Sequence, residues 1–205
     1  MQEPSIRAYS GQRRHTIRLG GLRRVLPIVQ IDPHTWIASD ANLILGDVGF
    51  LSQAADLLAR KVRPLGVDAV LTAEAKSIPL AYELSRKLGL DRFVVARKSI
   101  KSYMGDYASQ KLKSITTRVE QELLLTKEEM LWLSGKRVCL LDDVVSTGAT
   151  LGALEELAKK AGASVGCRAS IWKEGPWYTG EDLVCLGLLP VFVSDASPLA
   201  KRGPR

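Results

Sequence analysis

The most informative stretch of the sequence is VCLLDDVVSTGAT, residues 138–150. It predicts a short buried strand at 138–141 that runs into two adjacent acids and then into a turn of small residues, and an apolar helical pattern begins near Leu151. Such a turn can direct backbone N–H groups, hydroxyls and the positive end of a helix at a phosphate group. Gly148 has no Cβ, so it lets the backbone approach such a group closely. We therefore predict a phosphate-binding turn here.

We expect Asp142 and Asp143 to bind a group other than the phosphate, because carboxylates and phosphates are both negatively charged acceptors. They accept hydrogen bonds from hydroxyls, such as those of a ribose, or bind a metal ion that the ligand carries. The alternative is that the two acids only end the strand and cap the helix, but the full pattern favours a site for a phosphorylated sugar. The sequence contains neither G-x-x-x-x-G-K-[ST] nor G-x-G-x-x-G, which argues against ATP-driven and nicotinamide chemistry.

The segments around this motif predict an α/β fold. Helical periodicity covers 50–60, 78–88 and 151–160, and short apolar runs at 69–72, 93–96 and 164–171 predict further strands. Strands that alternate with helices form a mainly parallel sheet covered by helices on both faces. Ligands of such sheets bind at the carboxyl ends of the strands.

Composition places the chain among ordinary globular proteins. It has 205 residues, of which 46% are hydrophobic and 25% charged, and this length favours one domain. We find no apolar run long enough to span a membrane and no secretory signal, and we expect a cytoplasmic protein with no membrane partner. Cys139, Cys167 and Cys185 lie in apolar runs without C-x-x-C spacing, so we expect reduced core residues. The net charge of +7 suits an acidic ligand without identifying it.

The two ends and one internal segment are predicted to lie outside the regular fold. Residues 1–24 are rich in arginine and predict a solvated arm, 25–195 a single domain, and 196–205 a basic tail. A nucleic-acid or subunit contact of the arm is an alternative, but no base-reading motif accompanies it, so we expect no nucleic-acid partner. Residues 97–117 predict a long loop over the site, with a hairpin or helix over the sheet edge as the alternative.

The stretch at 138–150 resembles the phosphoribosyl diphosphate (PRPP) motif of type I phosphoribosyltransferases. The resemblance implies that Asp142 and Asp143 are catalytic residues that hold the ribose hydroxyls. It implies that the 5-phosphate is bound by Ser146, Thr147, Gly148, Ala149 and Thr150. It also implies the type I fold, a central mainly parallel sheet flanked by helices, with a small hood from the N-terminal region that uses about 25–48 and 172–190.

Two upstream segments extend the resemblance. The first is similar to the loop that binds the departing diphosphate, and consists here of Ala73, Glu74, Ala75, Lys76 and Ser77. Most relatives have a glycine at the position of Ser77. The second is an R-K-x-x-K pattern whose implied diphosphate ligands are Arg97, Lys98 and Lys101, the last also as a catalytic residue. The family further implies a homodimer and Mg²⁺ as cofactor, held through PRPP with Asp142 and Asp143 as candidate ligands.

Three short patterns indicate the branch of the family. VQIDP at 29–33, E-A-x-x-I at 74–78 and ARK at 96–98 are most similar to bacterial xanthine phosphoribosyltransferases. That resemblance implies a base site with Ile28, Lys173 and a stacking Trp172. A lysine donates hydrogen bonds and accepts none, so Lys173 would favour a 6-oxopurine such as xanthine, guanine or hypoxanthine.

The resemblance therefore implies a purine phosphoribosyltransferase of purine salvage. It would transfer 5-phosphoribosyl from PRPP to a purine base and release diphosphate. Two alternatives stay open from the sequence. One is adenine or orotate transfer, and the other is a PRPP-binding regulator that resembles purine repressors.

Overall fold

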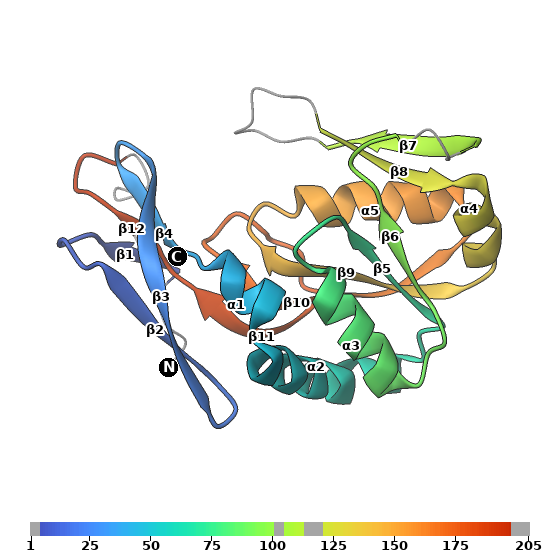
Figure 1. Ribbon diagram of the computed structural model, residues 1–205. Helices are drawn as coiled ribbons and strands as arrows, with labels where there is room; N and C mark the ends of the chain where they lie inside the picture. The colour runs from blue at the N-terminus through green and yellow to red at the C-terminus, as the bar shows by residue number, and fades with distance from the viewer. Residues whose placement is uncertain (1–4, 101–104, 113–120, 198–205) are drawn as a thin grey trace.

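A computed structural model describes residues 5–100, 105–112 and 121–197 of the chain and places them in a large and a small sheet with a separate hairpin (Figure 1). In the large sheet every strand pairs in parallel with its neighbours. The strand order is β11 (Leu183–Leu189), β10 (Ser164–Glu174), β9 (Arg137–Val145), β5 (Ala69–Ala73) and β6 (Phe93–Ala96). The predicted mainly parallel α/β sheet is confirmed.

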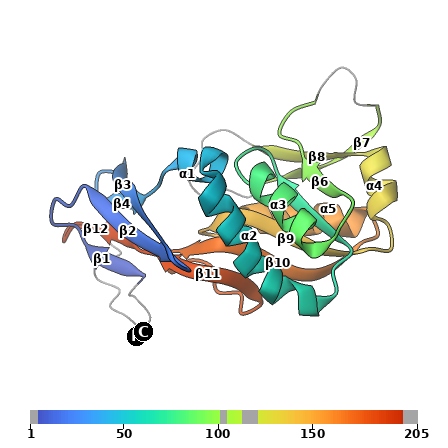
Figure 2. The ribbon, with the colours of Figure 1, turned by 60° about the horizontal axis from the view of Figure 1, so that its bottom comes forward.

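Helices cover both faces of the large sheet. α2 (Val48–Val62) and α3 (Ile78–Leu88) lie on one face, in front of the sheet in Figure 2, and α5 (Ala149–Lys160) lies on the other. Because both faces are covered, every residue of β5 is buried. The short 3₁₀ helix Arg63–Leu65 follows α2, and α4 (Lys127–Leu133) begins at a capping box in which Thr126 and Glu129 satisfy each other's backbone N–H groups.

The large sheet has a topological switch point between β5 and β9, because the connections that leave these two strands run to opposite sides of the sheet. From β5 the chain passes through α3 to β6 on one side, whereas β9, β10 and β11 extend to the other side. In open parallel sheets, ligands bind outside the carboxyl ends of the strands at such a switch point. The loops that follow β5 and β9 are therefore the expected place for a site.

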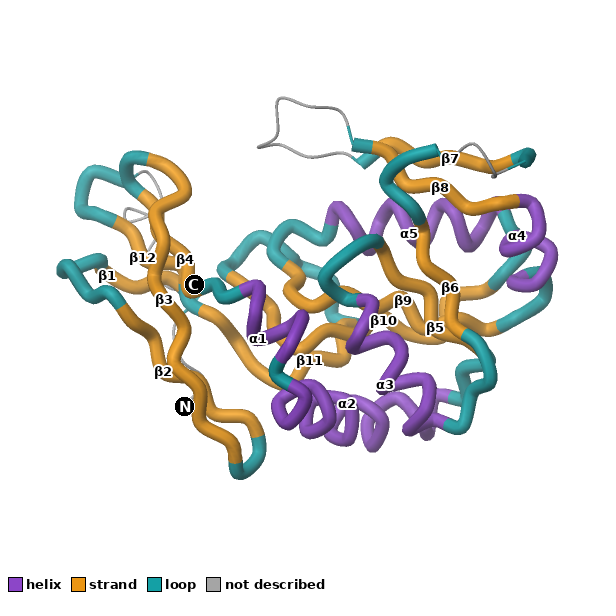
Figure 3. The backbone as a smooth tube through the Cα atoms, viewed as in Figure 1, coloured by secondary structure: helices purple, strands orange, loops and turns teal. Residues whose placement is uncertain are grey.

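A smaller sheet forms the hood, visible as a separate layer of strands in Figure 3. Its order is β1 (Ile6–Ala8), β12 (Val191–Val193), β4 (Thr35–Ala38), β3 (Leu22–Asp32) and β2 (Arg14–Leu19), and the short helix α1 (Ala41–Gly46) leads from it to the large sheet. Buried hood residues such as Ile17, Leu26 and Phe192 belong to the same apolar cluster as α2 and α3. The hood thus packs directly on the main core.

The hood corrects the prediction for the N-terminus. Residues predicted as a solvated arm form β1, β2 and the start of β3. In β2 the buried His15, Ile17 and Leu19 alternate strictly with exposed residues, a strand period that the many arginines concealed. The C-terminal contribution to the hood is β12, whereas residues 172–189 lie mainly in β10 and β11 of the large sheet.

The predicted long loop at 97–117 is also corrected where the structure describes it. β7 (Tyr107–Lys111) pairs antiparallel with β8 (Glu122–Thr126) in a hairpin beside α5. Arg97 exchanges two backbone hydrogen bonds of 2.9 Å with Leu124 of this hairpin. The hairpin is the alternative considered from the sequence, and Lys101 and most of the tail at 196–205 lie outside the described residues.

The cysteines and helices agree with the composition. Cys139 and Cys167 are buried, Cys185 is half-buried, and all three are free thiols, as predicted. None of the helices in the described ranges has both the length and the hydropathy that crossing a membrane requires.

We expect Leu140→Ala to lower the free energy of unfolding by about 2–5 kcal/mol, because Leu140 is fully buried in the central strand β9 and its removal leaves a cavity. Urea denaturation measures the change. Leu131→Ala is the matched control, since Leu131 on α4 is 69% exposed and its loss should change stability by less than about 0.5 kcal/mol. Equal effects of the two substitutions would contradict the assignment of β9 to the core.

Candidate active site

Two loops meet where β5 and β9 end. The loop after β5 contains Ser77, whose Oγ lies 3.1 Å from Oδ1 of Asp142 and 3.1 Å from Oδ1 of Asp143. The backbone N–H of Asp143 donates to the same Oγ over 2.9 Å. Ser77 is 2% exposed, so this contact is shielded from water. Ser77, which stands where relatives usually have a glycine, therefore joins the loop after β5 to the two acids near the end of β9.

The two acids have different surroundings. Asp143 is buried, and its Oδ2 lies 3.2 Å from Nζ of Lys76. Burial, and next the charge of Asp143, raises the pKa of Asp142 to about 7. The pair therefore resists carrying two negative charges until a hydroxyl or a cation comes close to it.

The predicted phosphate turn lies at the start of α5. Gly148 precedes the helix with a φ of +82°, in the left-handed region that favours glycine. A Cβ at this position would lie 2.5 Å from Cδ2 of Tyr178. Ala149 donates its backbone N–H to Oγ1 of Thr147 over 3.3 Å. The first N–H groups of α5 have no partner within the helix and face the turn.

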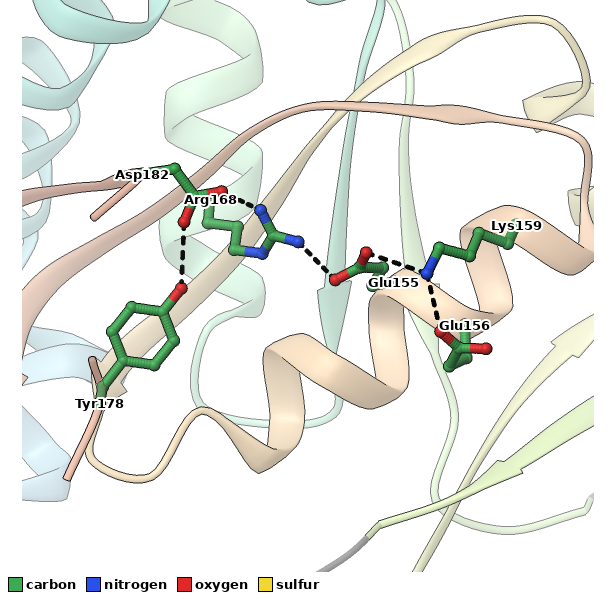
Figure 4. A network of polar contacts seen from close by, with 6 residues as sticks. All are labelled: Glu155, Glu156, Lys159, Arg168, Tyr178 and Asp182. Carbon is green, nitrogen blue, oxygen red and sulfur yellow. Dashed lines mark hydrogen bonds and ion pairs between the residues drawn. The ribbon is translucent and has the colours of Figure 1, made fainter. Parts of the chain in front are cut away.

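A network of polar contacts joins α5 to β10 and to the segment 178–182 (Figure 4). Arg168 of β10 contacts both Glu155 of α5 and Asp182. Asp182 in turn accepts a hydrogen bond of 3.4 Å from the hydroxyl of Tyr178, and Lys159 joins Glu155 to Glu156. Sequence analysis missed Tyr178, since no motif marks it; the glycine at 148, which makes room for its ring, was the available signal.

Two adjoining cavities open at this edge of the sheet. The larger, about 350 Å³, is lined by the loop 73–77, Lys98, Gln121, the two acids and Thr150, with a few apolar residues. The smaller, about 190 Å³, lies between the hood and the large sheet. Lys76, Asp143 and Val144 line both cavities. Asp143 thus stands at the boundary between the two cavities, and Asp142 lines the larger one.

The smaller cavity is mainly apolar with a few polar groups. Its apolar walls come from both sheets, with Leu26, Ile37 and Ala38 on the hood side and Val144, Trp172 and Leu189 on the other. Glu174 also lines it and is only 8% exposed. Burial chiefly raises the pKa of Glu174 to about 7; Lys76 opposes this shift and Asp143 adds to it.

Most predicted PRPP ligands lie together. Asp142, Asp143, Lys98 and Thr150 line the larger cavity with the whole loop 73–77, and Ser146 lines the smaller one. Lys98 also donates its backbone N–H to Oε2 of Glu74 over 2.9 Å. Thr147, Gly148 and Ala149 form the turn itself. Arg97 is not among the residues that line either cavity; its backbone pairs with the hairpin instead.

The predicted base ligands do not lie together in one cavity. Trp172 lines the smaller cavity, but it is 4% exposed and stacks on Phe50 with ring centroids 5.5 Å apart. Lys173 and Ile28 do not line this cavity. Side chains alternate along a strand, so Lys173 points to the opposite face of β10, where its Nζ lies 5.9 Å from the centroid of the Tyr178 ring. Glu174 occupies the cavity instead.

The acid pair fits a magnesium ion that arrives with its ligand. Mg²⁺ usually binds through one or two carboxylates together with substrate phosphates and water. Asp142 and Asp143 offer such carboxylates beside the larger cavity. Within the described ranges, no group of three or more His, Cys, Asp or Glu residues is placed to hold a metal ion.

Comparison with known proteins agrees with this geometry. A family model described as the phosphoribosyl transferase domain matches residues 47–186. The adenine phosphoribosyltransferase of Rhodospirillum rubrum is 33% identical over 131 residues, which cover 62% of this chain and 70% of the relative. The hypoxanthine/guanine phosphoribosyltransferase of Methanothermobacter thermautotrophicus is 36% identical over 115 residues, 56% of this chain and 55% of the relative.

Solved structures share the fold. The adenine phosphoribosyltransferase of Thermoanaerobacter pseudethanolicus has a TM-score of 0.63 and 19% identity, and the match covers 86% of this chain and 95% of that one. At this identity the likeness concerns the architecture, including the sheet that carries the two loops.

We expect Glu174→Gln to become more stable than the wild type as the pH rises. The pKa of Glu174 is about 7 in the folded chain and 4.5 ordinarily, so between these values only the unfolded chain loses the proton. Folding stability supplied by the protonated side chain is then fully present below pH 4.5 and lost by pH 7, by about 3 kcal/mol at most. The variant lacks this loss.

Urea denaturation of both proteins between pH 5 and 8 measures the difference in unfolding free energy. Asp142 titrates in both proteins, so its contribution cancels. If the difference in unfolding free energy between the two proteins stays constant over this pH range, Glu174 has an ordinary pKa in the folded chain. That result would contradict its burial.

Proposed function

The chain belongs to the phosphoribosyl transferase domain family, and from this premise we propose that it is a purine phosphoribosyltransferase. It transfers the 5-phosphoribosyl group from PRPP to a ring nitrogen of a purine base and releases diphosphate. The observation that carries this proposal is the acid pair Asp142 and Asp143, which lines the larger cavity together with the loop 73–77, while Asp143 also lines the smaller, mainly apolar cavity.

Each part of PRPP has matching residues. The ribose hydroxyls donate hydrogen bonds to the carboxylates of Asp142 and Asp143. The turn at 146–150 receives the 5-phosphate at the N-terminus of α5. The loop 73–77 and Lys98 line the space for the diphosphate, and Lys76 supplies positive charge between the two cavities. Lys101, in the segment outside the described residues, is proposed to contact the same group.

The chemistry is mainly one of position and charge. The bond between the anomeric carbon and a diphosphate oxygen breaks, a bond to the purine nitrogen forms with inversion, and the nitrogen loses its proton. Asp142 and Asp143 hold the ribose while positive charge develops on the ring. Mg²⁺, when bound with PRPP, supplies charge neutralisation of the diphosphate. The apolar walls of the smaller cavity keep water away from the reacting carbon.

The proposal also includes two features that rest on the family. We propose that the enzyme acts as a homodimer and that it serves purine salvage. The 6-oxopurine preference expected from Lys173 has lost its support, because Lys173 is on the face of β10 away from the cavity. The choice of base must depend on other residues.

The test is a diphosphate-release assay with PRPP and Mg²⁺ against adenine, guanine, hypoxanthine, xanthine and orotate in parallel. Release with a purine supports the proposal. Release with orotate alone would keep the PRPP site and overturn the purine assignment. PRPP binding without release for any base would favour the PRPP-binding regulator.

We expect the double substitution Asp142→Asn with Asp143→Asn to lower diphosphate release by at least about 100-fold, because the ribose loses its charged acceptors. The thermal unfolding midpoint should show a folded protein, since Asn keeps the shape and the hydrogen-bonding oxygen of Asp. Glu156→Gln, on the exposed side of α5, is the control that should keep full activity. Full activity in the double variant would sink the proposal.

A further inference from the structure

One acid in the smaller cavity has no task in the binding of PRPP. Glu174 ends β10 and is more than nine-tenths buried. Among the described residues, none forms a hydrogen bond or ion pair with its side chain. A buried carboxyl group without a partner costs stability, so its presence in the wall of a cavity points to a ligand that supplies the missing donor.

The other charged groups of the cavity already have partners. Nζ of Lys76 lies 3.2 Å from Oδ2 of Asp143. Oδ1 of Asp40 accepts the backbone N–H of Asn42 over 2.9 Å at the start of α1. Glu174 is therefore the charged group of this cavity that is left for an incoming molecule.

The cavity walls restrict the shape of that molecule. Trp172 and Glu174 are two residues apart on β10 and share a face of the strand, with Ile37 and Ala38 of the hood also in the wall. Apolar and aromatic walls with a small number of placed polar groups are typical of small-molecule sites, in which the polar groups fix the orientation of the ligand.

We propose that Glu174 selects the base, by accepting a hydrogen bond from an exocyclic amino group, so that the preferred substrates are aminopurines. This inference rests on the proposed function. Glu174 is ionised above its pKa of about 7, and there its carboxylate accepts hydrogen bonds without donating any, so it pairs with an amino group. An oxo group at the same place would set two acceptor oxygens against each other and leave both unpaired. The preference is the reverse of the one that Lys173 would have produced.

Two pairs of bases test the proposal, because each pair exchanges an amino for an oxo group at one ring position. Adenine and hypoxanthine differ in this way at carbon 6, and guanine and xanthine at carbon 2. At about pH 8.5, where Glu174 is ionised, we expect kcat/KM of the wild type to favour the amino member of at least one pair by about tenfold or more, the factor that one hydrogen bond supplies.

Glu174→Gln sharpens the test, because the amide has the same shape and can donate to an oxo group. We expect the amino-to-oxo ratio of kcat/KM to fall at least tenfold in this variant, while KM for PRPP stays within about twofold. Glu174→Leu, of similar size but without an acceptor, should also lose the ratio. Glu156→Gln serves as the surface control, and thermal unfolding confirms that each variant is folded.

The outcomes separate the two proposals. Transfer to purines with a ratio that is the same in the wild type and both Glu174 variants would overturn the role of Glu174 and leave the transferase intact. A wild type that prefers the oxo member of both pairs would do the same. Failure to transfer to any purine, with PRPP still bound, would overturn the proposed function and this inference with it.

Discussion

The parallel pairing of β5 with β9 is the constraint on which the site depends. Thr72 lies opposite Leu141 in this register, and its buried hydroxyl donates to the carbonyl oxygen of Leu141 over 2.8 Å. Strand β5 ends one residue after Thr72, at Ala73, and β9 continues from Leu141 through Asp142 and Asp143 to Val145, so the loop after β5 meets the two acids on β9. Ser77 then reaches both acids. A shift of one residue would turn the side chains of either strand to the opposite face and separate these groups.

Patterns local to the sequence were enough to predict the centre of this molecule. The strand–turn–helix at 138–150 and the alternation of helical and apolar segments lie within windows of about fifteen residues. These elements lie at the predicted positions, except that β9 continues past the predicted 138–141 through both acids to Val145. The hood was implied only in part, from 25–48 and 172–190. Strands β1 and β2 escaped prediction because β1 pairs with β12, almost the whole chain length away. Glu174 escaped it for another reason. The choice between Lys173 and Glu174 depends on which face of β10 meets the cavity, and no local pattern determines that.

The site gathers acids in a basic protein. The chain has a net charge of +7, yet Asp142, Asp143 and Glu174 all line the two cavities, and Lys76 is the one basic residue in the described part of the chain that lines both. Burial and mutual repulsion shift the proton affinities of Asp142 and Glu174 upward. The binding of a ligand with hydroxyls, an accompanying cation or an amino group would relieve that repulsion. The acids of this site are therefore suited to a ligand that brings hydrogen-bond donors or a cation.

The hood has a consequence for the order in which the chain can assemble during synthesis. Strand β12 lies between β1 and β4 and hydrogen-bonds to both. Strand β1 therefore cannot pair in its sheet until β12, which follows every other described strand along the chain, has left the ribosome. The large sheet, in contrast, is complete once β11 has emerged. We therefore expect the nascent chain to form its PRPP loops first and to close the second cavity only after translation has passed residue 193.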